Sequence, residues 1–159
     1  MIKIENLKKS FGENQVLKGV NLEIKTGETV VVLGRSGCGK SVLLKHIVGL
    51  LRPDSGKVYV DGEDVTTATG AKLYKIRRKI AMVFQGSALL DSLTVGENVG
   101  LWLQEHTDLP KSKIREIVRQ KLQLVELEGI EDKMPSELSG GMKKRVAIAR
   151  ALAIEPQYI

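Results

Sequence analysis

The residues best suited to chemistry form one glycine-rich stretch near the start of the chain. The stretch from Gly34 to Ser41 fits the pattern G-x-x-x-x-G-K-[ST]. Its glycines let the backbone curl so that successive N–H groups point inward and form a nest for an anion. Lys40 supplies a mobile cation for the β- and γ-phosphates of a nucleotide, and Ser41 supplies a hydroxyl for Mg²⁺. The predicted phosphate site is therefore Gly34, Arg35, Ser36, Gly37, Cys38, Gly39, Lys40 and Ser41.

A second candidate site is the segment Leu138-Ser139-Gly140-Gly141-Met142, which precedes a basic helix predicted over residues 141–153. Ser139 is a good N-cap residue, and glycines allow a ligand to approach the backbone closely. A helix cap explains the serine alone. It does not explain two glycines at a helix start, where they lower helix stability. We therefore expect a ligand at this helix start.

The elements that must position these residues are predicted from hydrophobic spacing. A continuous β-branched run, Glu28–Leu33, predicts a strand buried on both faces just before the glycine-rich stretch. Ile80–Phe84 predicts a second buried strand. Further strands are expected near residues 2–7, 20–24 and 57–61, and helices over 40–51, 94–103, 112–124 and 141–153. The helix over 40–51 is apolar nearly all round and is expected to be buried, and Asp61-Gly62 is a hairpin signal. The pattern indicates an α/β fold.

Composition excludes several classes of protein. The chain has 159 residues, with 25 Lys and Arg against 19 Asp and Glu, and is 42% hydrophobic. No apolar stretch approaches the roughly 20 residues of a membrane span, and the first residues do not form a secretory signal. Cys38 is the one cysteine, so an internal disulfide and a Cys/His zinc cluster are excluded. The basic segment 71–79 is better explained as a solvated face than as a lipid or nucleic-acid site.

Two other kinds of nucleotide site fit poorly. A dinucleotide site requires G-x-G-x-x-G, but the third glycine is missing after Gly37-x-Gly39, where Val42 stands. A guanine site requires a motif such as Asn-Lys-x-Asp, which the sequence lacks.

Three features of the sequence resemble ABC-type ATPases in their order and spacing. They are the glycine-rich phosphate loop, Gln85 at the end of a predicted strand, and Leu-Ser-Gly-Gly before a basic helix. The resemblance covers essentially all 159 residues. It implies a P-loop NTPase core with a mixed sheet and a helical subdomain insert. The implied single nucleotide-binding domain, incomplete at its C-terminus, has a sheet core at 1–85, a helical subdomain at 86–138 and a return to the core at 139–159.

The resemblance also implies roles for individual residues. In that family two nucleotide domains dimerise head to tail, with ATP between one domain's phosphate loop and the other's Leu-Ser-Gly-Gly. Residues 34–41 would then bind phosphates in cis, while Ser139, Gly140 and Gly141 would contact the γ-phosphate in trans. Gln85 would touch Mg²⁺ or the attacking water and sense the transporter. Phe11 matches the aromatic residue that stacks on adenine. The catalytic candidates are Lys40 and Gln85.

Two departures from the family pattern point to a subfamily. Val42 replaces the usual Thr, which removes a hydroxyl but leaves a backbone N–H for an α-phosphate. Met142 replaces the usual Gln. Together with the segments 84–95 and 141–147, these features look like the ATPases of lipid-trafficking importers linked to outer-membrane lipid asymmetry and solvent tolerance. An ATPase of an amino-acid or other importer is the alternative.

The resemblance predicts membrane permease subunits as partners and a peripheral location on the cytoplasmic face of the cell membrane. Neither nucleic acid nor direct membrane insertion is expected. A non-transport ABC protein that acts on nucleic acid or ribosomes is a further alternative, but such proteins usually carry tandem nucleotide domains and this chain has one phosphate loop.

Several family residues have no counterpart in this chain. The metal-positioning Asp and the catalytic Glu follow the strand that begins at Tyr158-Ile159, and a switch His comes later. The two histidines present, His46 and His106, both precede the Leu-Ser-Gly-Gly segment and are interpreted as structural or surface residues. Because phosphoryl transfer depends on positioning and charge neutralisation, this chain is expected to hydrolyse ATP negligibly. A regulatory domain that binds nucleotide without turnover is the second hypothesis.

Overall fold

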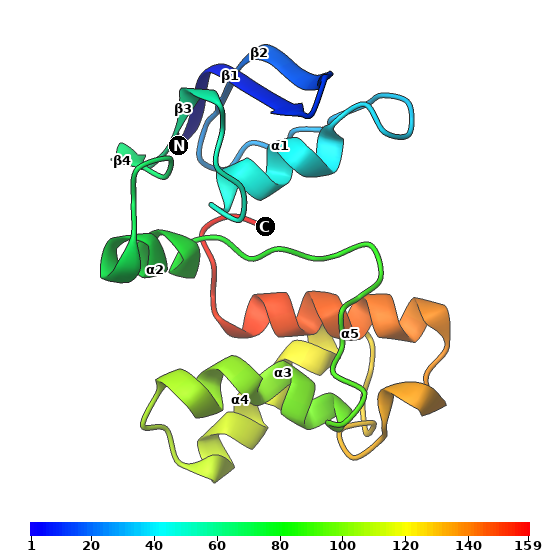
Figure 1. The fold of residues 1–159 in the computed structure, drawn as a ribbon. Coiled ribbons are helices and arrows are strands. Elements are labelled where there is room, and N and C mark those ends of the chain that lie inside the picture. Colours follow the sequence, from blue (N-terminus) through cyan, green and yellow to red (C-terminus); the bar gives the residue numbers. More distant parts are fainter. The chain divides into compact units, whose positions relative to one another are not determined.

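The computed structural model describes residues 1–159, which form two compact units, Met1–Arg77 and Arg78–Ile159 (Figure 1). The first unit holds the sheet, and the second holds three of the longer helices. None of the helices is long and apolar enough to cross a membrane.

A four-stranded antiparallel sheet in the order β2-β1-β3-β4 organises the first unit. Its strands are β1 (Ile2–Phe11), β2 (Asn14–Ile24), β3 (Ser55–Val60) and β4 (Glu63–Asp64). Alternate side chains such as Ile2, Ile4 and Val58 are buried, as the sequence alternation predicts. The Asp61-Gly62 hairpin signal is confirmed, because both residues have positive φ, 49° and 80°, between β3 and β4.

The helix after the glycine-rich stretch is α1 (Lys40–Ile47), which is shorter than the predicted 40–51. It buries Leu43, His46 and Ile47, but Leu44 is exposed. The expectation that this helix is buried is therefore only partly correct, because its apolar residue Leu44 is exposed. The basic segment forms α2 (Gly70–Arg78), in which Ile76 is the buried residue. Its lysines are exposed, as expected of a solvated face.

The second unit contains α3 (Val95–His106), α4 (Lys111–Leu124), the 3-10 turn η1 (Pro135–Glu137) and α5 (Gly140–Ala153). These helices confirm the three predicted from the sequence to within a few residues at their ends. Their apolar faces meet in one core, made of Val95, Val99, Leu103, Ile114, Val118, Leu122, Leu127, Ile130, Leu138, Val146, Ala149 and Ala153. This core fixes α5 relative to α3 and α4.

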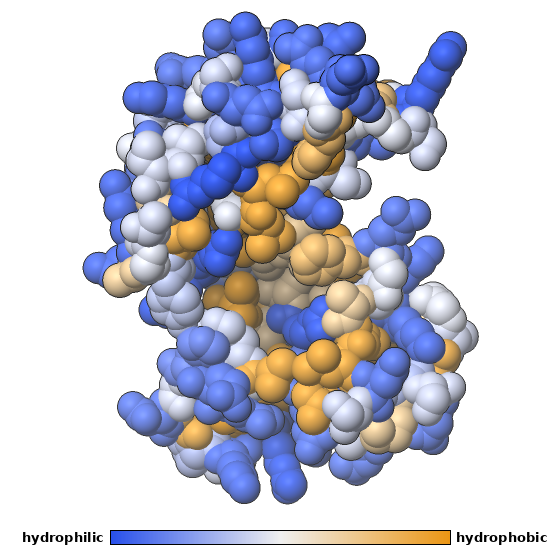
Figure 2. Space-filling model, viewed as in Figure 1, coloured by the Kyte–Doolittle hydropathy of each residue, from blue (hydrophilic) through white to orange (hydrophobic).

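The two strands predicted to be buried are not formed. Residues 28–33 are outside any strand, and Val31 and Leu33 are 73% and 86% exposed. The segment 80–84 makes one parallel bridge, between Ile80 and Tyr158, while Phe84 is exposed. A strand buried on both faces needs hydrogen-bonded neighbours, and no strand pairs along either run. Figure 2 shows apolar side chains at the surface among hydrophilic ones.

Candidate functional site

The glycine-rich loop leads directly into α1 and depends on its glycines for shape. Gly37 and Gly39 have φ of 79° and 101°, a region that side-chain-bearing residues rarely adopt. A Cβ on Gly39 would lie 2.8 Å from Val16 Cγ1, because the loop packs against β2. A Cβ on Gly34 would lie 2.6 Å from the Cys38 sulfur. A side chain at Gly39 would therefore be both strained and crowded, and one at Gly34 would require the Cys38 side chain to move.

The start of α1 is open to an anion. Gly39 is its N-cap residue, so no side chain caps the helix, and no acidic residue lies in its first turn. The first amide groups of a helix carry partial positive charge and lack intrahelical partners. An uncapped helix start after a glycine-rich turn is a suitable site for a phosphate group.

Lys40 lies over the loop that precedes it. Its Nζ donates hydrogen bonds to the carbonyl oxygens of Gly34 (2.7 Å) and Arg35 (2.9 Å). The same nitrogen is 3.8 Å from the Cys38 sulfur. These bonds fold the side chain back toward the loop, so the ammonium group is held at the predicted phosphate site.

The residues present fit a Mg²⁺ ion that binds together with a nucleotide. No group of three His, Cys, Asp or Glu side chains could hold a metal ion by itself. Mg²⁺ in nucleotide sites usually keeps several water molecules and takes further oxygens from the phosphates, so few protein ligands are needed. The exposed Ser41 hydroxyl, next to the phosphate loop, can supply one of them.

Phe11 lies at the end of β1 and is 49% exposed. The Nζ of Lys9 is 5.5 Å from the centre of its ring. Lys9 also donates a 2.8 Å hydrogen bond to Asp54, whose other oxygen accepts from the Ser10 backbone N–H. The Lys9 bond, followed by the Ser10 bond, lowers the pKa of Asp54 below its ordinary value. Phe11 is thus an exposed aromatic residue at the end of a strand, and its contact with adenine stays a prediction.

Gln85 belongs to the second unit, in an exposed loop between Phe84 and Ser87. The loop turns sharply after it, since the Ser87 N–H donates to the Phe84 carbonyl oxygen at 2.9 Å. The carbonyl oxygens of Ser87 and Ala88 then accept hydrogen bonds from the Arg150 guanidinium. Arg150 was not singled out from the sequence, where a single Arg in a basic helix carries no signal of this contact.

The Leu-Ser-Gly-Gly segment opens α5 as predicted. The Ser139 hydroxyl accepts a hydrogen bond from the Met142 N–H at 3.3 Å, which confirms it as the N-cap residue. Ser139, Gly140 and Gly141 are all exposed, and a Cβ on Gly140 would meet nothing within 4 Å. Packing within the chain therefore does not explain this glycine. A role for these residues in ligand contact stays a prediction.

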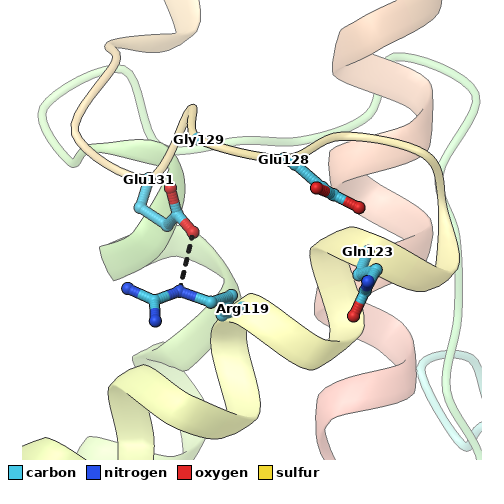
Figure 3. Close-up of a pocket in the computed structure, with 5 residues that line it drawn as sticks. All are labelled: Arg119, Gln123, Glu128, Gly129 and Glu131. Atoms are coloured by element: carbon cyan, nitrogen blue, oxygen red, sulfur yellow. Dashed lines mark ion pairs between the residues drawn. The ribbon is translucent and has the colours of Figure 1, made fainter.

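The predicted site residues are divided between the two units. Phe11 and residues 34–42 belong to the first unit, whereas Gln85 and Ser139–Gly141 belong to the second. A separate shallow hollow in the second unit contains none of them. It is lined by Arg119, Gln123, Glu128, Gly129 and Glu131, with Arg119 Nε 3.7 Å from a Glu131 oxygen (Figure 3).

Comparison with known proteins gives consistent matches over this chain. The sequence model of the family described as "ABC transporter" matches residues 17–159. The chain is 47% identical over 158 residues to the "Probable ribonucleotide transport ATP-binding protein mkl" of Mycobacterium leprae, covering 99% of this chain and 46% of that protein. It is 41% identical over 159 residues to the "Intermembrane phospholipid transport system ATP-binding protein MlaF" of Haemophilus influenzae, covering all of this chain and 60% of that protein.

A solved structure is also similar. It is described as a dimeric post-hydrolysis state of the ATP-binding cassette MJ0796 bound to ADP and Pi, with a TM-score of 0.90 and 41% identity, covering 98% of this chain and 71% of that one. The chain thus spans about half the length of the curated relatives it matches. The phosphate loop and the Leu-Ser-Gly-Gly segment lie within the residues that these comparisons match. The chain therefore belongs to the ABC transporter ATP-binding family, with the P-loop NTPase fold of its cassettes.

Proposed function

We propose that this chain is the ATP-binding part of a subunit that energises an ABC transporter. The observation that carries the proposal is the uncapped start of α1, with the Lys40 ammonium held over the glycine-rich loop. Residues Gly34–Ser41 would bind the phosphates of ATP, with the Val42 N–H as a further donor. Phe11 would stack on the adenine. The proposal is consistent with the ADP and Pi named for the similar cassette.

Hydrolysis is proposed for the whole protein, in which two such domains meet head to tail. Ser139, Gly140 and Gly141 of one domain would then contact the γ-phosphate held by the other domain's loop. Ser41 and Gln85 would be the Mg²⁺ ligands from this chain, and Lys40 would neutralise developing phosphate charge. Support comes from the exposed, unpacked glycines at the start of α5 and from the dimeric state of the similar cassette.

The proposed partners are membrane permease subunits, with the domain on the cytoplasmic face of the membrane. We propose a phospholipid or other hydrophobic cargo, which is supported by the segments around Gln85 and Met142 and by the printed name of the Haemophilus influenzae relative. A different cargo is the alternative, since the Mycobacterium leprae relative is named for ribonucleotide transport.

A calorimetric titration with ATP tests the proposed site. Charge-assisted hydrogen bonds contribute roughly 1.5–3 kcal/mol each, so Lys40→Ala is expected to weaken ATP binding about ten- to a hundredfold. Lys45→Ala is the matched control, because Lys45 is an exposed lysine in the last turn of the same helix. Equal affinities for the two variants would contradict the proposed role of Lys40.

A further inference from the structure

One arginine side chain of α5 donates hydrogen bonds to the loop that follows Gln85. The Arg150 guanidinium donates to the carbonyl oxygen of Ala88 at 2.7 Å and to that of Ser87 at 2.9 Å. The guanidinium is half-buried, and this burial lowers the pKa of Arg150. In Figure 1 the green segment between α2 and α3 crosses α5 before it enters α3.

The backbone at this contact has an unusual conformation. Ser87 and Ala88 have φ of 65° and 49°, in the left-handed region, although neither is glycine. A residue with a side chain rarely adopts this conformation, and the conformation persists only where its surroundings hold it. The two carbonyl groups turn toward one guanidinium, whose rigid fork suits two acceptors at once. Arg150 is therefore the side chain that stabilises this turn.

The far end of the same loop has a separate anchor. The fully buried Asn98 side chain accepts from the Leu90 N–H and donates to the carbonyl oxygens of Leu90, Leu93 and Thr94. These bonds fix the loop from residue 90 onward without Arg150. Arg150 thus controls the part of the loop that lies directly beside Gln85.

Arg150 also connects this loop to the Leu-Ser-Gly-Gly segment. Arg150 and Gly140 both belong to α5, and at 1.5 Å per residue they are separated by about 15 Å along this continuous helix. Val146, Ala149 and Ala153 of the same helix are packed in the core of the second unit. The helix therefore links its glycine start and the Gln85 loop through a rigid element.

We propose that Arg150 is a positioning residue, which holds the loop at Ser87 and Ala88 so that Gln85 is presented in one place relative to the start of α5. This inference rests on the proposed function, in which Gln85 is a Mg²⁺ ligand. Without the guanidinium, the turn relaxes and Gln85 loses its fixed position, while the phosphate loop in the first unit is unchanged.

Arg145 provides a matched control on the same helix. Its guanidinium donates to the carbonyl oxygens of Val125 and Glu126, both at 3.2 Å, and Glu126 also has a positive φ of 57°. The contact is of the same kind but holds a different loop. Arg145→Ala therefore reproduces the loss of an arginine–carbonyl contact without touching the loop after Gln85.

The first measurement is amide hydrogen exchange followed by mass spectrometry on the full chain. Arg150→Ala is expected to speed exchange in residues 84–89 about tenfold or more, because bonds to a charged group are lost there. Arg145→Ala should instead speed exchange in residues 125–128. Arg150→Lys keeps the positive charge but lacks the forked guanidinium group. This variant replaces Arg150→Ala in the measurement if the alanine variant does not fold. Unchanged exchange in residues 84–89 in the folded variant would overturn the proposal.

The second measurement is the gain in ATP affinity on adding Mg²⁺, compared with ATP in excess chelator. Arg150→Ala and Gln85→Ala should each reduce this gain by about tenfold, and the double variant should lose no more than either single variant. Affinity in chelator should stay unchanged. Additive losses, or a retained Mg²⁺ gain in Arg150→Ala, would make Arg150 a purely structural residue and overturn the positioning role.

The two proposals fail in distinguishable ways. If wild-type chain does not bind ATP, the proposed function fails whatever the exchange data show. If wild type shows the Mg²⁺ gain and Gln85→Ala retains it, Gln85 is not the metal ligand, and the positioning role of Arg150 is overturned with it.

Discussion

At the scale of single residues, the phosphate loop depends on glycines for two separable reasons, backbone conformation and lack of space. Gly27 and Gly39 both have positive φ, 81° and 101°. A Cβ on Gly27 would meet nothing within 4 Å, whereas one on Gly39 would lie 2.8 Å from a Val16 methyl group and 3.2 Å from a Leu17 methyl group. The pair therefore separates the effect of φ from the effect of crowding.

We expect Gly27→Ala to lower the free energy of unfolding by about 1–2 kcal/mol, from the left-handed conformation alone. Gly39→Ala should lower it further, because overpacking commonly adds about 1–3 kcal/mol. Urea denaturation of both variants measures the difference. A Gly39→Ala variant no less stable than Gly27→Ala would show that the loop adapts to the added methyl group.

Asp54 carries the residue-scale prediction that depends on pH. Its pKa is lowered in the folded chain by the Lys9 hydrogen bond and then by the Ser10 N–H. A lowered folded-state pKa means that the carboxylate stabilises the fold above its unfolded pKa. That contribution is lost as the pH falls below about 3.8, the ordinary value, and through the folded value.

An NMR titration of the Asp54 side-chain carboxyl should therefore give a pKa below 3.8. Lys9→Ala is expected to move that pKa upward, since it removes the largest cause of the shift. Lys8→Ala, one position along β1, is the control. The explanation would be wrong if both lysine variants left the Asp54 pKa where it is in the wild type.

At the scale of elements, the start of α3 is fixed by a capping box in which both bonds are formed. Thr94 Oγ1 accepts from the Glu97 N–H at 3.2 Å, and a Glu97 carboxylate oxygen accepts from the Thr94 N–H at 2.8 Å. The reciprocal pair satisfies two backbone donors that no helical bond can reach. The cap therefore determines where the loop from Gln85 ends.

Thr94→Ala is expected to lower the free energy of unfolding by about 1 kcal/mol, the usual cost of removing an N-cap side chain. Ser112→Ala is the comparison, because Ser112 is an exposed residue of the first turn of α4 and does not cap it. It should change stability by less than about 0.5 kcal/mol. Chemical denaturation giving equal effects for the two substitutions would contradict the capping role.

At the scale of the whole molecule, the distribution of the predicted site residues is the main feature. The phosphate loop and Phe11 belong to one compact unit, and Gln85 and Ser139–Gly141 belong to the other. Contacts to most of the nucleotide are thus predicted for the first unit, and contacts to the metal ion and the γ-phosphate for the second.

We expect the 159-residue chain to bind ATP but to hydrolyse it no faster than its Lys40→Ala variant. Phosphoryl transfer requires positioned metal and water, and the phosphate loop alone supplies neither in full. Phosphate release measured at saturating ATP tests this expectation. Turnover well above the Lys40→Ala value would mean that other residues of this chain complete the site.

The sequence by itself determined the helices of the second unit and the identity of the candidate phosphate site. Cap residues, apolar periodicity and the glycine–lysine pattern act over a few neighbouring residues, so they can be recognised without the fold. The strands expected at residues 28–33 and 80–84 were wrong, because a strand exists only where a neighbour pairs with it. That depends on residues distant in the sequence.

The contact between Arg150 and the loop after Gln85 was decided only by the tertiary structure. It joins residues 62 and 63 positions apart. It also uses backbone carbonyl oxygens, which every residue possesses, so no residue type at Ser87 or Ala88 marks it. The sequence thus shows which side chains can do the chemistry. The packing of α5 against α3 and α4 decides that Arg150 is the side chain that contacts the loop after Gln85.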